Sequence, residues 1–498
     1  MSVDSAVASF FRLYYFHFFS LFFPIFRLIS MTYKHLHISR FYSRKVLALC
    51  AGFALFAGCN SDDDGYTPLA INTTPDSGQV YQNATLNLNI FVNDNNIPEA
   101  GTIEFSTPSK GIAAISTHGN GQDLAQQELI YTPSGASIGD DVFTYTVCDA
   151  SGQQCSTASI TITVLPFSPV QLDLSSVPYP KLSDYNFFEG PMSDLSPVYG
   201  VLPYEPISAL FSDYAKKKRF VWMPNNTSAS YVSDAVLLDF PTGSVLIKAF
   251  YYNNVLPAIE TKIIETRLLI KQETGWIFAE YIWDEAQQEA YLDVDGYGAN
   301  IPVEWLENGV AKEVNYRVPS QSQCYTCHKF YELATPIGPK PQGLNGLFDY
   351  ADGASNQLQK WQEMGYLDNS LPQSIETVVD WSDATEPLDL RVRSYFDINC
   401  SSCHSDSGHC DYRSLRMNFN LSHDLANLGV CVDPDTPIPG YENDKIIEPG
   451  DTLNSILYFR LHTTLEEYRM PLLGRTLRHD EALLFIEQWI LNLTPACD

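Results

Sequence analysis

The sequence predicts a multidomain protein with an N-terminal all-β sandwich, a second β-rich domain and a mainly α-helical C-terminal region. Apolar and polar residues alternate within residues 66–166, and strand-like runs bounded by turn residues recur within residues 167–318. After residue 385, apolar residues recur instead at helical spacing. With 498 residues, the chain is long enough for several domains, each with its own core.

Residues 1–58 are predicted to be a targeting segment. After Met31, four basic residues precede an apolar run at 46–56, and Ala57-Gly58-Cys59 follows. This is the order of a secretory signal that ends in a lipobox, so Cys59 is the predicted lipidated residue, with a plain cleaved signal as the alternative. Residues 1–30 are explained by a start codon placed too far upstream, with Met31 as the true start, or by an extra membrane-embedded helix.

Residues 59–65 are polar and predict a short lipid-anchored tether. The chain is therefore expected to be exported and held at the periplasmic side of a bacterial membrane or at the cell surface. The outer membrane is favoured over the inner one. The formal net charge of the chain, −29, disfavours nucleic acid as a partner and suits basic redox proteins better.

Residues 66–166 show the strand pattern most clearly. Leu86, Leu88 and Ile90 alternate with asparagines, and the stretch 158–164 alternates Ala, Ile and Val with Ser and Thr. The segments 129–133 and 139–147 resemble bacterial Ig-like and cadherin-like repeats, which implies a β-sandwich that serves as a spacer or an adhesion module. Cys148 and Cys155 flank a turn, so we expect a hairpin-closing disulfide. The acidic residues Asp94, Asp140 and Asp141 are read as turn residues rather than calcium ligands.

Residues 167–318 predict a second β-rich domain. The strongest strand candidates are residues 244–252, 265–271 and 276–283, separated by turns that contain Gly and Asn. One basic run, Lys216-Lys217-Lys218-Arg219, stands out in this domain. We interpret it as a solvated face rather than a docking site.

Two copies of the motif Cys-x-x-Cys-His follow, formed by Cys324, Cys327 and His328 and by Cys400, Cys403 and His404. This spacing lets two thiols bond the two vinyl groups of one haem while the next residue supplies an imidazole to the iron. The motifs therefore predict two covalently attached c-type haems. A four-thiolate zinc site and a thioredoxin-like redox pair are the alternatives, but neither requires a His after each pair.

The second motif has the clearer surroundings. A helical pattern from Pro387 leads into Cys400, and a final helix is expected to begin near Asp480 and to stop at Pro495. Arg469-Met470-Pro471-Leu472 lies between them and resembles the Met-Pro loop of class I cytochromes c. The resemblance implies such a domain at residues 385–498, with His404 and Met470 as the iron ligands.

The first motif, within residues 319–384, is less well defined because residues 316–320 are read as a loop and no Met-Pro loop follows. His328 is the proximal ligand by its motif. The candidates for a second ligand are Met364, His409, His423, His462 and His479, and an open iron site is a further possibility. Cys410 and Cys431 are expected to form a disulfide, which leaves Cys497 without an assigned partner.

The order of these segments resembles a family of bacterial diheme c-type cytochrome lipoproteins. The resemblance covers residues 167–498, is strongest at the two haem motifs, and implies single-electron transfer with redox protein partners. Two alternatives stay open. One is a diheme peroxidase-like enzyme in which the first haem has an open site, and the other is an adhesive or scaffold module in which redox activity is secondary.

Overall fold

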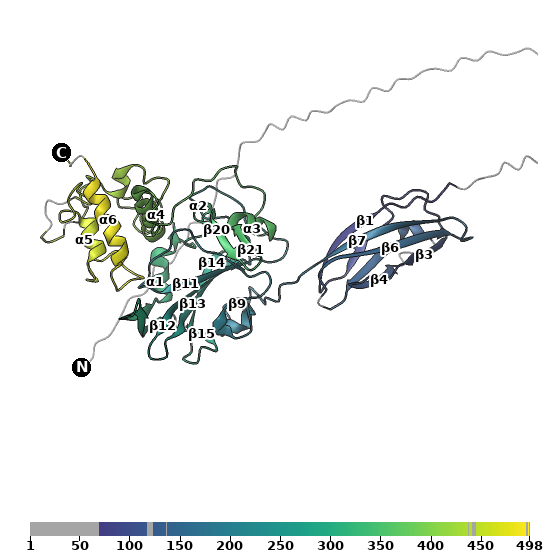
Figure 1. The fold of residues 1–498 in the computed structure, drawn as a ribbon, viewed down its shortest axis with the longest axis horizontal. Coiled ribbons are helices and arrows are strands. Elements are labelled where there is room, and N and C mark those ends of the chain that lie inside the picture. Colours follow the sequence, from purple (N-terminus) through teal and green to yellow (C-terminus); the bar gives the residue numbers. More distant parts are fainter. Residues whose placement is uncertain are drawn as a thin grey trace, which may run out of the picture. The chain divides into compact units, whose positions relative to one another are not determined.

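The computed structural model describes residues 69–116, 123–135, 137–436, 438–440, 445–494 and 497 (Figure 1). The targeting segment, the start at Met31, the lipidated Cys59 and the tether at 59–65 lie outside these residues. Among the residues described, none of the helices has the length and apolar character needed to cross a bilayer.

The first domain has two sheets, ordered β1-β7-β6-β3 and β2-β5-β4. The strands β1 and β7 pair in parallel, and the other neighbours pair antiparallel. A short 3-10 helix, η1 (Leu124–Gln126), precedes β5. The strands are β1 (Asp76–Tyr81), β2 (Leu86–Leu88), β3 (Gly101–Phe105), β4 (Gly111–Ser116), β5 (Glu128–Pro133), β6 (Gly139–Asp149) and β7 (Cys155–Leu165).

The core of this domain follows from the alternation in its sequence. Tyr145 and Val147 of β6 and Ile160 and Ile162 of β7 are fully buried, whereas their Thr and Ser neighbours lie on the other face. The all-β sandwich prediction is therefore confirmed.

Cys148 and Cys155 confirm the predicted hairpin disulfide. They are directly opposite each other in the β6–β7 register and are bonded. Asp141, considered above as a turn residue, is fully buried and accepts hydrogen bonds from the backbone N–H of Ser109 and Lys110 and from the Tyr131 hydroxyl. These bonds give Asp141 a structural role.

Asp76, at the start of β1, predicts a pH dependence of this domain. Its Oδ2 is buried without a hydrogen-bond partner, and burial, followed by the nearby Asp94 carboxylate, raises the pKa of Asp76 to about 6. The folded domain therefore binds this proton more tightly than the unfolded chain, so its stability falls as the pH rises from about 4 to about 6. Urea unfolding of residues 66–166 across this range is expected to show that loss.

In Asp76→Asn, which has no proton to release, we expect the slope of stability against pH to flatten between these values. Asp140→Asn is the matched control, because it removes an exposed carboxylate from the same domain. An unchanged slope in Asp76→Asn would contradict the role of Asp76.

The second domain is built on a sheet with the order β10-β11-β12-β13-β14-β15, to which the β16–β17 hairpin is joined through β12. The strands predicted at 244–252, 265–271 and 276–283 are present as β12, β13 and β14. Two 3-10 helices, η2 (Leu182–Tyr185) and η3 (Met192–Asp194), precede the sheet. The strands are β8 (Phe188–Glu189), β9 (Ser196–Pro197), β10 (Leu202–Pro203), β11 (Lys216–Trp222), β12 (Val245–Val255), β13 (Glu260–Gln272), β14 (Gly275–Trp283), β15 (Ala290–Leu292), β16 (Ala299–Glu307) and β17 (Val310–Val318).

The basic run at 216–219 is a solvated face only in part, so the interpretation fails for Lys217 and Arg219. It forms the first half of β11, so its side chains alternate between the two faces of the sheet. Lys216 and Lys218 are exposed, Lys217 is half-buried and Arg219 is only 6% exposed. Two of the four cations therefore point into the protein.

The remaining elements lie between residues 321 and 492 and include the two Cys-x-x-Cys-His motifs. They are α1 (Gln321–Cys327), β18 (Lys329–Phe330), β19 (Leu333–Ala334), α2 (Pro341–Leu344), β20 (Leu347–Tyr350), β21 (Gly353–Asn356), α3 (Gln357–Glu363), α4 (Leu388–Cys400), η4 (Leu425–Leu428), α5 (Ile456–His462) and α6 (Asp480–Asn492). In Figure 1, α1 lies between the group formed by α4, α5 and α6 and the sheet that contains β11–β14.

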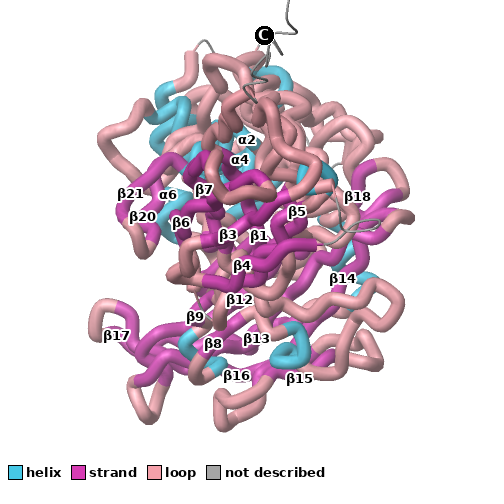
Figure 2. The backbone as a smooth tube through the Cα atoms, turned by 90° about the vertical axis from the view of Figure 1, so that its right-hand side faces the viewer, coloured by secondary structure: helices cyan, strands magenta, loops and turns pink. Residues whose placement is uncertain are grey.

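The two helices predicted after residue 385 are present. Pro387 precedes α4, and α6 begins at Asp480. Both bury apolar residues in a common cluster, which includes Phe396 of α4 and Ile486 and Trp489 of α6. Loops and turns nevertheless make up much of this region, as Figure 2 shows, so it is less helical than the mainly α description predicts.

The expected disulfide between Cys410 and Cys431 is replaced by one between Cys431 and Cys497. The Cys431 N–H donates to the Ile447 carbonyl, and the Cys497 N–H donates to the Glu448 side chain, so neighbouring residues position both cysteines. Cys410 is buried and unbonded. A bridge between cysteines 66 residues apart restricts the unfolded chain strongly. In the chain-entropy description, this stabilises the folded state by about 4 kcal/mol.

Candidate cofactor site

The cysteines of the first motif lie on the short helix α1, whereas no helix was expected to lead into this motif. Ser320 caps this helix, since its hydroxyl accepts from the Gln323 N–H while the Gln323 side chain accepts from the Ser320 N–H. The preceding residues, which we read as a loop, belong to β17 up to Val318. The capping box Ser-x-x-Gln was the sequence signal for this helix.

The second motif follows α4 as predicted. Cys400 is the last residue of the helix, and the N–H groups of Cys403 and His404 both donate to its carbonyl. These bonds form one further turn, which places the two thiols and the imidazole of the motif within that turn.

The two motifs meet in space although 76 residues separate Cys327 from Cys403. Their Sγ atoms are 3.9 Å apart, and the Cys403 thiol also lies 3.5 Å from the Thr326 carbonyl oxygen. Cofactors attached to the two motifs would therefore be close neighbours.

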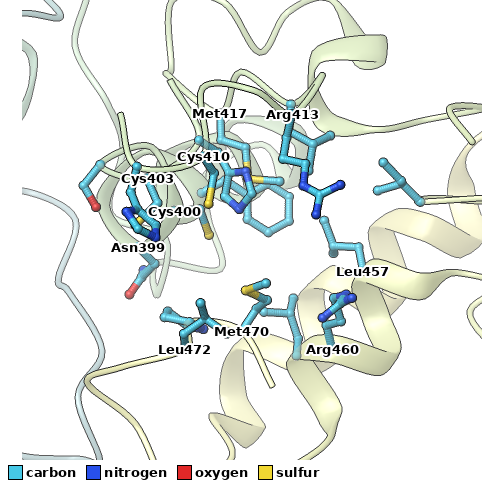
Figure 3. Close-up of a pocket in the computed structure, with 18 of the residues that line it drawn as sticks. Asn399, Cys400, Cys403, Cys410, Arg413, Met417, Leu457, Arg460, Met470 and Leu472 are labelled. Atoms are coloured by element: carbon cyan, nitrogen blue, oxygen red, sulfur yellow. The ribbon is translucent and has the colours of Figure 1, made fainter. Parts of the chain in front are cut away.

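A cavity lies beside the second motif and is lined by its two cysteines and its histidine, Cys400, Cys403 and His404, together with Met470. Figure 3 shows Cys400 and Cys403 at one end of this cavity, Arg413 and Arg460 at the other, and Met470 on a separate wall. The structure thus brings the sequence-predicted residues of the second site together.

His404 has the properties of a free imidazole ligand. Its Nδ1 is buried without a hydrogen-bond partner. Burial, with smaller contributions from Arg413 and Arg416, lowers the pKa of His404 to about 4, so the ring is neutral at neutral pH. A neutral imidazole with an unused nitrogen can coordinate a metal.

The loop that bears Met470 is fixed by hydrogen bonds. The Met470 N–H donates to the Arg460 carbonyl. The guanidinium of Arg475, which is 4% exposed, donates to the backbone carbonyls of Met470, Leu477, Arg460 and Thr463. One buried side chain therefore joins α5 to the Met470 loop.

Around the first motif, His328 is well oriented. Its Nδ1 lies 3.1 Å from the Thr335 carbonyl oxygen, which leaves Nε2 available as a ligand. The ring of Phe278, from β14, has its centroid 5.3 Å from that of His328. Burial is the main cause that lowers the pKa of His328 to about 3.

Cys324 has different surroundings from Cys327. Its thiol is buried and donates to Glu280 Oε1 at 3.1 Å, and burial raises the pKa of Glu280 to about 7. Cys327 instead lines the cavity described above. The first motif is thus seated directly on the sheet of the second domain, through β14.

The candidates for a second ligand of the first motif lie in different places. Met364 packs against the apolar cluster that contains Cys324, and His409 lines the cavity of the second motif. His479 contacts the Tyr395 hydroxyl and stacks on Phe211.

The two remaining candidates make polar contacts of their own. His423 contacts the Asn420 carbonyl, and His462 contacts Arg478. Among the residues described, no group of three or more His, Cys, Asp or Glu side chains forms a metal site of protein ligands alone.

Among the residues that sequence reasoning missed in this cavity are one cation and one further methionine. Arg413 and Met417 line it, but both lie in loops with no motif that marks them. Cys410 was expected to pair with Cys431, but it is unbonded and forms part of the wall of this cavity.

A family model for the bacterial Ig domain matches residues 63–163. No curated protein matches the chain. Among solved structures, a 2,6-sialyltransferase of Photobacterium sp. JT-ISH-224 is 14% identical, with 20% of this chain and 19% of that one covered and a TM-score of 0.12. An endo-fucoidan hydrolase of glycoside hydrolase family 107 is 16% identical, with 42% and 28% covered and a TM-score of 0.15. TM-scores this low carry no argument about fold or function. The N-terminal sandwich is thus similar to bacterial Ig domains, in agreement with its two sheets.

Proposed function

We propose that this chain is an exported protein that binds two c-type haems covalently and passes single electrons between redox partners. The observation that carries the proposal is the approach of the two Cys-x-x-Cys-His motifs to a sulfur–sulfur distance of 3.9 Å, beside a cavity that also contains Met470. When bound, haem supplies an iron that changes between the ferrous and ferric states, which is one-electron chemistry.

The residues of the second site fit a haem in chemistry and placement. Cys400 and Cys403 supply two thiols at one end of the cavity, and His404 and Met470 supply an imidazole and a thioether. Arg413 and Arg460 lie at the opposite end (Figure 3), where they suit the two propionate carboxylates. Apolar side chains, among them Phe396 and Leu457, also line the cavity and would keep water from the ring.

Two features support an exported location. The disulfides Cys148–Cys155 and Cys431–Cys497 are stable only in an oxidising compartment. Covalent haem attachment also takes place outside the cytoplasm. With lipidation at Cys59, the protein would be anchored at a membrane surface, the outer membrane being favoured, and would meet its redox partners there.

Haem stoichiometry tests the proposal. The full chain, expressed with a haem-attachment system, is expected to contain two haems by intact mass and by the pyridine hemochrome assay. Replacing Cys324 and Cys327 with Ser, or Cys400 and Cys403 with Ser, is expected to reduce the number to one in each case. Replacing Cys410 with Ser is the matched control and should leave two.

Absence of covalent haem from the unaltered chain would overturn the proposal. Electron transfer is separated from peroxidase-like catalysis by adding peroxide to the reduced protein in the presence of an excess of a small-molecule electron donor, with the donor and peroxide alone as the blank. A carrier is oxidised slowly and without turnover, whereas sustained peroxide consumption would favour the enzyme.

A further inference from the structure

A row of charged residues crosses the sheet of the second domain on the face that meets the first motif. Arg219 of β11 is paired with Lys248 of β12, Lys248 with Arg267 of β13, and Arg267 with Glu280 of β14. Residues directly opposite one another on neighbouring strands point to the same face. Three strand spacings make the row about 14 Å long.

The row starts at the first motif, because Glu280 accepts the hydrogen bond of the Cys324 thiol. Phe278 precedes Glu280 by two residues, so it lies on the same face, and it packs against the His328 ring. The cations Arg267, Lys248 and Arg219 then follow across the sheet, progressively farther from that thiol.

Three cations of this region gather around one aromatic ring. Lys248 Nζ, Arg267 Cζ and Lys217 Nζ lie 4.9, 4.4 and 5.8 Å from the centroid of the Phe250 ring. Arg267 is paired with Glu265 at 2.6 Å, and Lys217 donates to two backbone carbonyls.

Lys248 and Arg219 are the incompletely paired members. Within the part of the chain that the structure describes, Lys248 makes neither an ion pair nor a hydrogen bond through its side chain. Arg219 is 6% exposed, and its buried Nη1 makes no hydrogen bond and lies 3.7 Å from Glu205. Burial lowers the pKa of Lys248, and the neighbouring Arg219 lowers it further. Lys248 is half-buried and Arg219 is buried. A cation withdrawn from water is stabilised by an anion close by, so this end of the row fits an anionic group.

The geometry suits one particular anion. The vinyl groups and the propionates of a haem lie at opposite edges of the ring. In the cavity beside the second motif, the thiols of Cys400 and Cys403 and the guanidinium groups of Arg413 and Arg460 are likewise at opposite ends (Figure 3). The row repeats this arrangement, with the Cys324 thiol at the Glu280 end and the incompletely paired cations at the other.

We propose, on the basis of the proposed function, that Lys248 and Arg219 bind the propionates of the haem attached to Cys324 and Cys327. The second domain then forms one wall of the first haem site rather than acting as a separate module. This assigns a binding role to the sheet and to the inward-facing half of the basic run at 216–219.

The test uses the full haem-loaded chain with Lys248→Gln, and Lys216→Gln as control, because Lys216 is an exposed cation on the opposite face of β11. Midpoint potentials of both haems are measured by spectroelectrochemistry from pH 5 to pH 8. In Lys248→Gln one potential is expected to fall, because an unpaired propionate favours ferric iron. That potential should also become dependent on pH, because the pKa of a propionate without its cation rises. The potential of the other haem in Lys248→Gln, and both potentials in Lys216→Gln, should match those of the unaltered chain. Lys248→Arg should restore the potential that falls in Lys248→Gln.

Two attached haems with unchanged potentials and pH profiles in Lys248→Gln would overturn the inference and leave the proposed function intact. Lack of covalent haem in the unaltered chain would overturn the proposed function itself. If Lys248→Gln loses haem from the peptide that contains Cys324, retention of that haem in Lys248→Arg supports the inference. Loss from both variants would overturn it.

Discussion

Replacing Met470 with Leu is expected to lower the midpoint potential of the haem proposed at Cys400 and Cys403 by on the order of 0.1–0.3 V. A thioether ligand stabilises ferrous iron, and Leu has nearly the same volume but no sulfur, so the ligand is lost while the cavity remains filled. The backbone of the loop is expected to stay in place, because the bonds from Arg475 go to carbonyl groups. Potentiometric titration and optical spectra measure the change.

Met417→Leu is the matched control for this substitution. Met417 is 3% exposed and lines the same cavity, and its N–H donates to the His404 carbonyl. Met417→Leu should leave the potential and the low-spin spectrum unchanged. Both variants should contain two haems by mass. A fall in potential in Met417→Leu with none in Met470→Leu would transfer the ligand role to Met417.

Asp213→Ala is expected to lower the free energy of unfolding by about 4 kcal/mol. Asp213 belongs to the second domain and is 3% exposed, yet its carboxylate accepts from the backbone N–H groups of Thr476 and Leu477 at 2.7 Å and from the Thr476 hydroxyl at 3.0 Å. Alanine would leave these partly buried donors without their acceptor. The C-terminal region should then unfold at a lower denaturant concentration.

Tryptophan fluorescence suits this measurement, because all seven tryptophans lie between residues 222 and 489, outside the Ig-like domain. Asp213→Asn should lose less unfolding free energy than Asp213→Ala. Asn keeps one acceptor oxygen and tolerates the left-handed backbone of this position, where φ is 46°. Asp383→Ala is the control, because its exposed carboxylate makes similar bonds to Thr385. A loss in Asp213→Ala no larger than in the control would contradict the proposed link between the domains.

Local patterns predicted the elements of the fold well. The alternation around Ile160 and Ile162 predicted a sandwich strand, and the spacing that follows Pro387 predicted the helix before the second motif. The hairpin disulfide was predictable because Cys148 and Cys155 flank a single turn. In each case the information lies within a dozen residues.

Contacts between distant segments were not predictable in this way. The bridge from Cys431 to Cys497 depends on how the chain returns past residues 447 and 448. Four consecutive cations suggested a solvated surface, but a strand sends every second one to the opposite face, where Arg219 is buried. The meeting of Cys327 with Cys403, and of Asp213 with Thr476, likewise has no local signal.

The four carbonyl bonds of Arg475 have a consequence for the rate of the proposed electron transfer. That rate depends on how far atoms must shift when the charge on the metal changes. A methionine whose loop is bonded to a single buried guanidinium has little freedom to shift. If Met470 binds iron as proposed, such a ligand would keep the reorganisation energy small, and electrons could pass quickly even between partners with little difference in potential.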